Sequence, residues 1–224
     1  MSLNNDIVLL AIRGALKPTT IEEARAVHNQ TAGNSQGVAA ARALGDLSHN
    51  VYVPLQDAPS VASELLILDL WNSVEGLGKF FADPQAQAGG NMIFASRDPV
   101  VWRLAPTSGF ILPTPASRDR RFVGIIRGRV KSREAATDAF DTFARRAINA
   151  GRLAGQISHQ VFFRLAPPDA PPSLELLGVD VWMDAEGMSR VYDDRAHLAP
   201  IADVFAEAPT TSRWKQPAGS WVEW

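Results

Sequence analysis

Two histidines and two aspartates are the side chains most able to do chemistry, because each recurs at a matching place about 110 residues along the chain. His49 and His159 each follow a serine near the start of a short apolar segment, and Asp69 and Asp180 each lie within a longer one. An imidazole titrates near neutral pH and can act as a general base, while a carboxylate can orient it. These four residues are the predicted catalytic groups.

A structural interpretation of the same residues is also open. A buried aspartate must be paired or hydrogen-bonded. A neighbouring strand, a helix N-terminus or an arginine such as Arg13 or Arg127 could meet that need. A histidine at the start of a strand could likewise serve packing alone. His49 alternates with Val51, which could place it on a helix-covered face, and the sequence leaves its face undecided.

The segment 64–71 predicts which way the first aspartate points, because side chains alternate between the two faces of a strand. Leu66 and Leu68 belong to a purely aliphatic side, which we expect to contact helices. Asp69 and Trp71 belong to the other side. We therefore expect them to face the space between two sheets.

Aromatic and arginine side chains at matching positions are the predicted binding residues, since small-molecule pockets are mostly apolar with a few polar groups. The predicted substrate-binding residues are Trp71, Trp182, Tyr52, Phe162, Arg13 and Arg127. Gly178 stands where the first copy has Ile67. We therefore expect any pocket to be roomier beside the second copy.

Several kinds of chemistry find no motif in the sequence. There is no cysteine, which excludes disulfides, thiolate nucleophiles and cysteine-ligated metals. His28 and His197 stand alone, and no histidine or carboxylate pattern has metal-ligand spacing. No phosphate-binding or dinucleotide-binding glycine pattern is present. We expect neither a metal nor a cofactor.

The composition is that of an ordinary globular protein. The 224 residues are 46% hydrophobic and 21% charged, and the formal net charge is −2. This balance gives no reason to expect nucleic acid or a membrane surface as a partner. No basic segment precedes an apolar core at the N-terminus, and no apolar run is long enough to span a membrane. The expected location is the cytoplasm.

An internal repeat determines the predicted architecture. The stretch from Glu64 to Gly76 recurs from Glu175 to Gly187. The identical pairs are Glu64/Glu175, Leu65/Leu176, Leu66/Leu177, Asp69/Asp180, Trp71/Trp182, Glu75/Glu186 and Gly76/Gly187. Further matches occur in the same order on both sides. The chain is therefore a duplication.

Each copy is predicted to run strand, helix, strand, strand, helix, strand. The expected strands lie at 7–12, 48–55, 64–71 and 100–104 in the first copy, and at 122–127, 158–165, 175–182 and 211–216 in the second. Thr20 and Glu23 form a capping-box pattern that opens the first helix. Apolar residues at helical spacing predict its counterpart over 133–149.

This order is the split βαβ arrangement of ferredoxin-like units. Each unit has helices on only one face of its sheet, so the other face needs cover. We predict an α+β fold in which two tandem ferredoxin-like βαββαβ repeats pack sheet to sheet as an intrachain α/β-barrel. The predicted boundaries are 1–112 for repeat 1, 113–120 for a linker and 121–224 for repeat 2.

The passages 68–76 and 179–187 resemble the dimeric α/β-barrel superfamily, which includes antibiotic-biosynthesis-type monooxygenases and stress-responsive A/B-barrel proteins. Its signature is an apolar strand ending in Trp, a polar turn, and a helix with an aromatic residue and Asp-Pro. The matching helix residues are Phe80, Phe81, Asp83 and Pro84. The resemblance implies that the duplication imitates, within one chain, the dimer of single-domain relatives.

The leading functional hypothesis is a cofactor-independent monooxygenase or isomerase acting on a small aromatic or polyketide-like molecule between the sheets. A histidine base would withdraw a proton and leave a carbanion that reacts with oxygen. The alternatives are a non-catalytic binding or structural protein, and a haem protein similar to chlorite dismutases. A small molecule is the partner left open, with the chain either a monomer containing its pseudo-dimer or a homodimer of it.

Overall fold

The computed structural model describes residues 7–58, 63–107, 109–111 and 121–224, and these form two compact units. Unit 1 comprises Met1–Val101 together with Pro217–Trp224, and unit 2 comprises Trp102–Gln216. Each unit thus includes the end of a strand or segment that the repeat boundaries assign to the other copy. The expected linker 113–120 lies outside the described residues.

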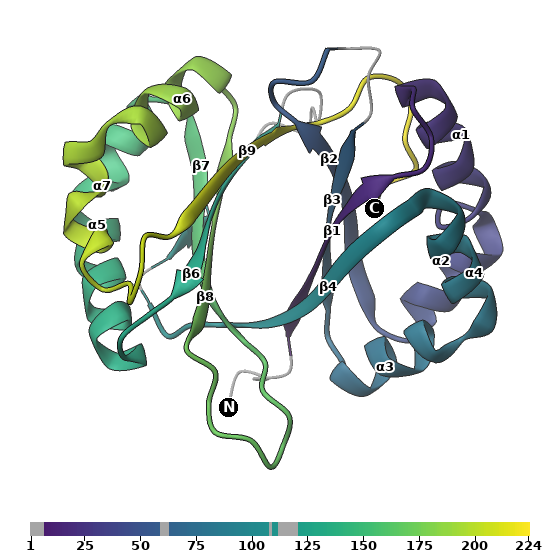
Figure 1. Cartoon of the computed structure of the whole chain (residues 1–224), viewed down its shortest axis with the longest axis horizontal. Helices are drawn as coiled ribbons and strands as arrows, with labels where there is room; N and C mark the ends of the chain where they lie inside the picture. The colour runs from purple at the N-terminus through teal and green to yellow at the C-terminus, as the bar shows by residue number, and fades with distance from the viewer. Residues whose placement is uncertain (1–6, 59–62, 108, 112–120) are drawn as a thin grey trace. The chain divides into compact units, whose positions relative to one another are not determined.

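Unit 1 has the predicted order of strands and helices, and its helices lie on one face of its sheet (Figure 1). Its sheet order is β4-β1-β3-β2, with β3 antiparallel to both β1 and β2. The elements are β1 (Val8–Leu16), α1 (Ile21–Gln30), α2 (Ser35–Ala43), β2 (Asp46–Pro54), β3 (Glu64–Trp71), α3 (Val74–Ala82), α4 (Pro84–Ile93) and β4 (Phe94–Leu104).

Unit 2 repeats this order with its helices again on one face of the sheet (Figure 1). Its strand order is β9-β6-β8-β7-β5, and the last residues of β4 also pair with β7. The elements are β5 (Phe110–Ile111), β6 (Phe122–Arg129), α5 (Arg133–Leu153), β7 (Gln156–Arg164), β8 (Glu175–Trp182), α6 (Ala185–Asp193), α7 (Arg195–Ala202) and β9 (Thr210–Lys215). The α+β class and the ferredoxin-like repeat are confirmed.

The first helical segment differs between the two units. In unit 1 the Thr20 hydroxyl accepts a hydrogen bond from the Glu23 amide at 3.2 Å, as the capping pattern predicts. The helix then stops at Gln30 and a second helix begins after Asn34, whose side chain caps it. The corresponding α5 continues unbroken for 21 residues. Residues at the break and in α2, such as Thr31, Asn34 and Ala41, line a cavity in unit 1.

The repeated glycines at the start of the later helices are explained by close packing. A β-carbon on Gly76 would overlap the carbonyl oxygen of Leu44, and one on Gly187 would overlap that of Ala154. Both carbonyls belong to the residue that ends the preceding helical segment. Glycine is therefore required in both copies so that the two helical segments can approach.

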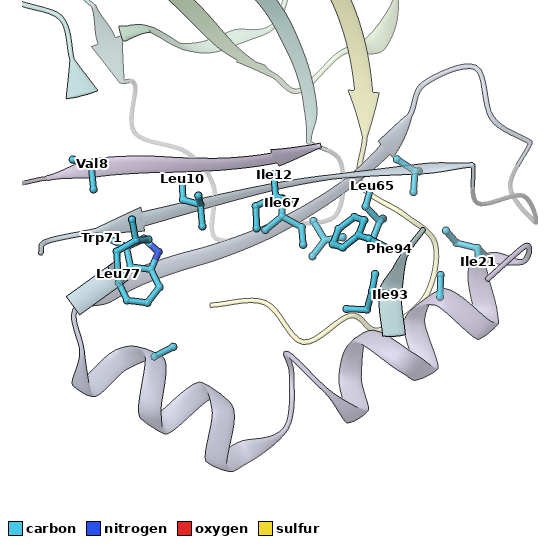
Figure 2. Close-up of a cluster of buried hydrophobic side chains, with 14 residues drawn as sticks. Val8, Leu10, Ile12, Ile21, Leu65, Ile67, Trp71, Leu77, Ile93 and Phe94 are labelled. Atoms are coloured by element: carbon cyan, nitrogen blue, oxygen red, sulfur yellow. The ribbon is translucent and has the colours of Figure 1, made fainter. Parts of the chain in front are cut away.

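The helices cover the face of the sheet that carries Asp69 and Trp71, so the predicted orientation of β3 is wrong. Trp71 packs in the core of unit 1 with helix residues such as Ile21 and Leu77 (Figure 2). The prediction failed because the aliphatic face of β3 is buried as well, with Leu66 4% and Leu68 7% exposed. When both faces are buried, aliphatic content does not identify the helix-covered one.

Candidate active site in unit 1

A β-bulge in β2 brings Asp46 to the helix-covered face of the unit 1 sheet, where His49 and Asp69 also lie. His49 pairs with Asp69 across β2 and β3, and Asp46 pairs with Trp71, with a register shift between Asp46 and Ser48. Positions 46 and 49 would face opposite sides of a regular strand, and the extra residue in the bulge brings them to the same side. The undecided face of His49 is therefore the helix face.

The three residues His28, His49 and Asp69 form a buried hydrogen-bonded series. Nδ1 of His49 lies 2.8 Å from Oδ1 of Asp69, and Nε2 of His49 lies 2.9 Å from Nε2 of His28. Nδ1 of His28 lies 3.0 Å from Oδ1 of Asn29. All three ionisable side chains are buried. Every ring nitrogen in the pair of histidines is therefore engaged.

Burial and neighbouring charges determine which ring nitrogens of His28 and His49 carry protons. Burial lowers the pKa of His28 to about 4, with the charge of His49 acting in the same direction. Burial also lowers the pKa of His49, but Asp69, Asp46 and Glu223 outweigh it and hold that pKa above its ordinary value. His49 is thus the charged imidazolium and donates to both Asp69 and His28. Neutral His28 accepts at Nε2 and donates from Nδ1 to Asn29.

A cavity of about 340 Å³ lies between the sheet and the helices of unit 1, next to this series. His49, Asp69 and Asp46 contribute to its wall. The remaining wall is rich in aromatic rings, namely Trp71, Phe80, Phe81, Phe94 and Trp224. Its size and apolar lining with few polar groups match small-molecule sites. This cavity lies between sheet and helices within unit 1, and the expected pocket between the sheets stays a prediction.

Asp46 is the most reactive group in the wall. Burial and the neighbouring charge of Asp69 raise its pKa to about 7, although His49 and the Trp224 indole oppose the rise. Oδ1 of Asp46 and Nε1 of Trp224 are both buried and make no well-formed hydrogen bond among the described residues, although the indole lies near enough to the Asp46 carboxyl to lower its pKa. An unpaired acceptor and an unpaired donor in one cavity wall are a ready place for a polar group of a ligand.

The C-terminal segment of the chain completes this wall. The amide of His49 donates to the main-chain oxygen of Trp224 at 2.7 Å, and the amide of Trp224 donates back at 3.2 Å. The Trp224 ring stacks on the His49 ring with 4.7 Å between centroids. Glu223 accepts from the amide of Val51 at 2.7 Å. Residues at the far end of the sequence therefore hold the first copy's histidine.

Unit 2 contains the matching His159 and Asp180, with Nδ1 and Oδ1 2.6 Å apart. The Asp180 carboxylate also accepts from Nε2 of Gln156 at 3.0 Å and from the Tyr192 hydroxyl at 2.9 Å. Burial and the charge of Asp180 raise the pKa of Tyr192 well above its ordinary value, so its hydroxyl stays protonated. The polar groups of unit 2 thus satisfy one another.

Phe140 takes the place of His28 in unit 2. One helical turn earlier the two copies carry Ala24 and Ala136, both fully buried. The Phe140 ring stacks on His159 with 6.2 Å between centroids and leaves Nε2 of His159 without a hydrogen-bond partner among the described residues. Only about 20 Å³ is free beside His159 and Asp180. That is room for about one water molecule.

The expectation that the pocket would be roomier beside the second copy is wrong. A β-carbon on Gly178 would lie 2.6 Å from Cγ2 of Ile126, so the side chain of Ile126 already fills the space that the glycine leaves. The Tyr192 ring lies against Gly124 in the same way. Absence of a side chain at one position does not open a cavity when neighbours close over it.

The other predicted binding residues lie away from the cavity. Tyr52 pairs with Leu66, and Phe162 with Leu177, on the sheet faces opposite the histidines. Arg13 forms an ion pair with Glu64 at 2.8 Å. Arg127 pairs with Glu175 and lies over the Trp102 ring, while Trp182 is fully buried. Of the predicted binding residues, Trp71 is the one in the cavity wall.

Sequence reasoning missed His28, Asp46 and Trp224. The repeat gave no signal for them, because the second copy has Phe140 at the first position and Gln156 at the second. A bulge also hides the shared face of Asp46 and His49 from a two-residue period. The difference between the copies was itself a usable signal. Polar residues present in one copy alone, such as His28, mark the places where the copies diverge.

Comparison with solved structures identifies the fold. An anthrone oxidase-like protein is 14% identical, with 97% of this chain and 94% of that chain covered and a TM-score of 0.64. A monooxygenase candidate from Fusobacterium nucleatum is 10% identical, with 99% of each chain covered and a TM-score of 0.62. A chlorite dismutase variant from Candidatus Nitrospira defluvii is 7% identical, with coverages of 96% and 92% and a TM-score of 0.56.

These neighbours define the class: the chain has the dimeric α/β-barrel fold built from ferredoxin-like units. No family model matches the sequence, and no curated protein matches it. At such low identity the likeness shows the fold alone. Any activity must therefore be argued from the side chains.

The described residues do not fit a haem. Both ring nitrogens of His28 and of His49 are hydrogen-bonded, so neither can serve as a ligand to iron without breaking the series. Nε2 of His159 has no partner, but the free space beside it is about 20 Å³. No three histidines or carboxylates within the described ranges are grouped to hold a metal ion.

No helix in the described residues is long and apolar enough to cross a membrane.

Proposed function

We propose that unit 1 is the active site of an enzyme that oxidises a small aromatic molecule with O₂ and without a cofactor. One observation carries the proposal. The Asp46 carboxyl has a pKa of about 7 and an unbonded oxygen in the wall of an aromatic-lined cavity. A base with a pKa near the working pH is suited to proton abstraction. The anthrone oxidase-like and monooxygenase neighbours support the same reaction class.

Two unpaired atoms provide the first step. The substrate is an aromatic ketone with an acidic ring methylene group. Ionised Asp46 takes a proton from that carbon, and the electron pair moves onto the ketone oxygen. The free N–H of Trp224 donates to this oxygen, and the positive charge of His49 beside it stabilises the developing negative charge. Asp69 fixes the imidazolium through Nδ1.

The second step consumes oxygen. The carbanion attacks O₂, which is bound with it in the cavity, and the resulting peroxide loses water as the methylene becomes a carbonyl. The balance is one CH₂ group and one O₂ giving one C=O group and one H₂O. The substrate supplies the electrons that reduce the second oxygen atom, so a flavin or metal is not required. Aromatic walls favour both the planar substrate and the flat enolate.

Unit 2 keeps the histidine–aspartate pair for structure in this proposal. Its carboxylate accepts from Gln156, His159 and Tyr192, and the free space beside it is only about 20 Å³. The non-catalytic interpretation therefore applies to His159 and Asp180, and the catalytic one to His49 and Asp69 with Asp46 as the base. An isomerase would use the same base but return the proton to another carbon without consuming oxygen.

Oxygen uptake tests the proposal. The full chain is incubated with anthrone, and oxygen consumption and quinone absorbance are followed together. We expect one O₂ per quinone, with Asp46→Asn reducing kcat by about 10²–10⁴-fold. The control Asp138→Asn removes an exposed carboxylate of unit 2 and should leave the rate unchanged. A Soret band in the purified protein, or full activity in Asp46→Asn, would overturn the proposal.

A further inference from the structure

We propose that the cavity of unit 1 selects aromatic molecules that carry a carboxylate, and that Arg97 is the residue that binds it. This inference deepens the proposed function and rests on it for the identity of the cavity. Arg97 follows Phe94 in β4 and lies in the cavity wall, half-buried. A guanidinium matches a carboxylate with two parallel hydrogen bonds, which gives both affinity and orientation.

Two glycines make room for this arginine. A β-carbon on Gly90, in the interior of α4, would overlap the Arg97 guanidinium. A β-carbon on Gly14 would lie about 3.0 Å from Cβ of Arg97 and would overlap Ser96 and Phe94. Glycine within a helix is less favourable than alanine. A glycine at position 90 is explained by the guanidinium that crosses it.

The charge of Arg97 has no carboxylate partner among the described residues. Its Nη2 donates to the amide oxygen of Gln87 at 2.9 Å and to that of Asn91 at 3.3 Å. Both acceptors are neutral, so they hold the guanidinium in place without neutralising it. A guanidinium has five N–H donors, which leaves several free for a ligand.

Of the three carboxylates that share the wall, Asp69 and Asp83 are engaged elsewhere, and Asp46 lies toward the other end of the cavity. Asp83 caps α4 by accepting from the amides of Gln85 and Ala86. Asp69 accepts from charged His49. The other cation in the wall, Lys79, is exposed and pairs with Glu75 at 2.6 Å. Arg97 is therefore the cation of this wall that is best placed to receive an anion.

The register of the sheet separates Arg97 from the acid–base groups. Arg97 lies beside Gly14, which pairs with Leu65 near the start of β3, whereas Asp46 pairs with Trp71 at its end. The two places are six residues apart along one strand, which is about 20 Å of backbone. A ligand that reached both places would therefore have its acid group on Arg97 and its reactive carbon toward Asp46, at opposite ends of the cavity.

Binding of a matched pair of probes tests the inference without any turnover. Anthraquinone-2-carboxylate and anthraquinone-2-carboxamide have the same ring system and are already oxidised. Their Kd values for the full chain are measured by calorimetry. We expect the carboxylate to bind at least tenfold more tightly, with the preference shrinking as salt rises. Equal Kd values, or binding of neither probe at millimolar concentration, would overturn the inference.

Variants assign the preference to Arg97. Arg97→Gln should abolish it and leave the amide's Kd unchanged, while Arg97→Lys should retain a part of it. Gly90→Ala should also reduce it, because the methyl group displaces the guanidinium, and alanine favours the helix and so keeps the fold. The control Arg145→Gln alters an exposed arginine of α5 that pairs with Asp141 and should change neither Kd. A preference that survives in Arg97→Gln refutes the assignment.

The two proposals fail separately. Probe binding with the predicted preference but no oxygen uptake by any anthrone would refute the oxidase function and leave the anion site standing. Oxygen uptake without a preference for the carboxylate would do the reverse. Thermal unfolding of each variant shows that the fold is intact before either result is interpreted.

Discussion

Nε2 of His28 and Nε2 of His49 lie 2.9 Å apart, so two buried imidazoles must share one proton. The sharing is unequal, since the pKa of His28 is lowered to about 4 and that of His49 is raised. The second copy has no such pair, because Phe140 replaces the first histidine. The copies therefore differ at the position that decides the charge of His49.

The first prediction concerns this pair. His28→Phe makes unit 1 resemble unit 2 and leaves Nε2–H of His49 buried without an acceptor. We expect the free energy of unfolding to fall by about 1–3 kcal/mol at pH 7. Urea denaturation measures it. The reverse change, Phe140→His, supplies a partner for Nε2 of His159 and serves as the comparison. An unchanged His28→Phe midpoint would contradict a hydrogen bond between the two rings.

The second prediction concerns stability against pH. The folded pKa of His28, about 4, lies below its ordinary 6.5, so the unfolded chain binds more protons between these values. Stability from this residue is therefore lost as pH falls from 6.5 to 4, by up to about 3 kcal/mol. The folded pKa of Asp46, about 7, lies above its ordinary 3.8. Its contribution is present at low pH and is lost as pH rises toward 7.

These two slopes oppose each other between pH 4 and 6.5, so the wild-type curve should be flatter than either alone. Asp46→Asn should leave stability rising with pH in this window, and His28→Phe should leave it falling. Unfolding midpoints across the window distinguish the variants. Parallel curves for the two variants would contradict opposite contributions from His28 and Asp46.

The third prediction is a pH–rate profile. Only ionised Asp46 can accept the substrate proton, so kcat/KM should rise through pH about 7 and level off above it. Because Asp69 adds to the rise in pKa, a change that removes its charge should shift the profile to lower pH. Asp69→Asn tests this, with thermal unfolding as the check on the fold. A profile that instead falls through pH 7 would identify a catalytic acid.

The fourth prediction separates the ring of Trp224 from its N–H. Trp224→Phe keeps an aromatic ring over His49 but removes the donor that faces the cavity. We expect kcat to fall by about 10²-fold or more, with little change in probe affinity. The same change at Trp221, whose Nε1 already donates to the Ala218 carbonyl, is the control. Equal losses from both variants would point to packing.

The fifth prediction tests the division of labour between the units. Tyr192→Phe removes a hydroxyl that donates to Asp180 and leaves the ring in place. Unfolding free energy should fall by about 1–3 kcal/mol, because a buried carboxylate loses a donor. Probe binding and oxygen uptake should stay at wild-type values. A loss of either function with the fold intact would place a working site in unit 2.

The sequence predicted the elements because duplication repeats each pattern twice. The strand segments around Asp69 and Asp180 agree in both copies, and a capping hydroxyl opens the first helix of each, Thr20 in one and Ser132 in the other. The pairs His49/Asp69 and His159/Asp180 are also brought together as hydrogen-bonded neighbours. Duplicated residues thus located the two equivalent sites.

Divergence explains what was missed. A comparison of copies favours residues that stayed the same, whereas the cavity depends on those that changed, such as Asp46 against Gln156. Packing decides the rest, since Ile126 closes the space at Gly178 through a neighbour that no strand pattern reveals. The orientation of β3 failed for a similar reason, because both of its faces are buried.

The segment Pro217–Trp224 follows unit 2 in the sequence but belongs to unit 1. A polypeptide that stops at residue 112 would retain Asp46, His49 and Asp69 yet lack the indole ring stacked on His49 and the Glu223 carboxylate that holds Val51. Swapping first halves between homologous chains would therefore combine one lineage's cavity floor with another lineage's cover. The wall of the unit 1 cavity is therefore encoded on both sides of the segment that encodes unit 2.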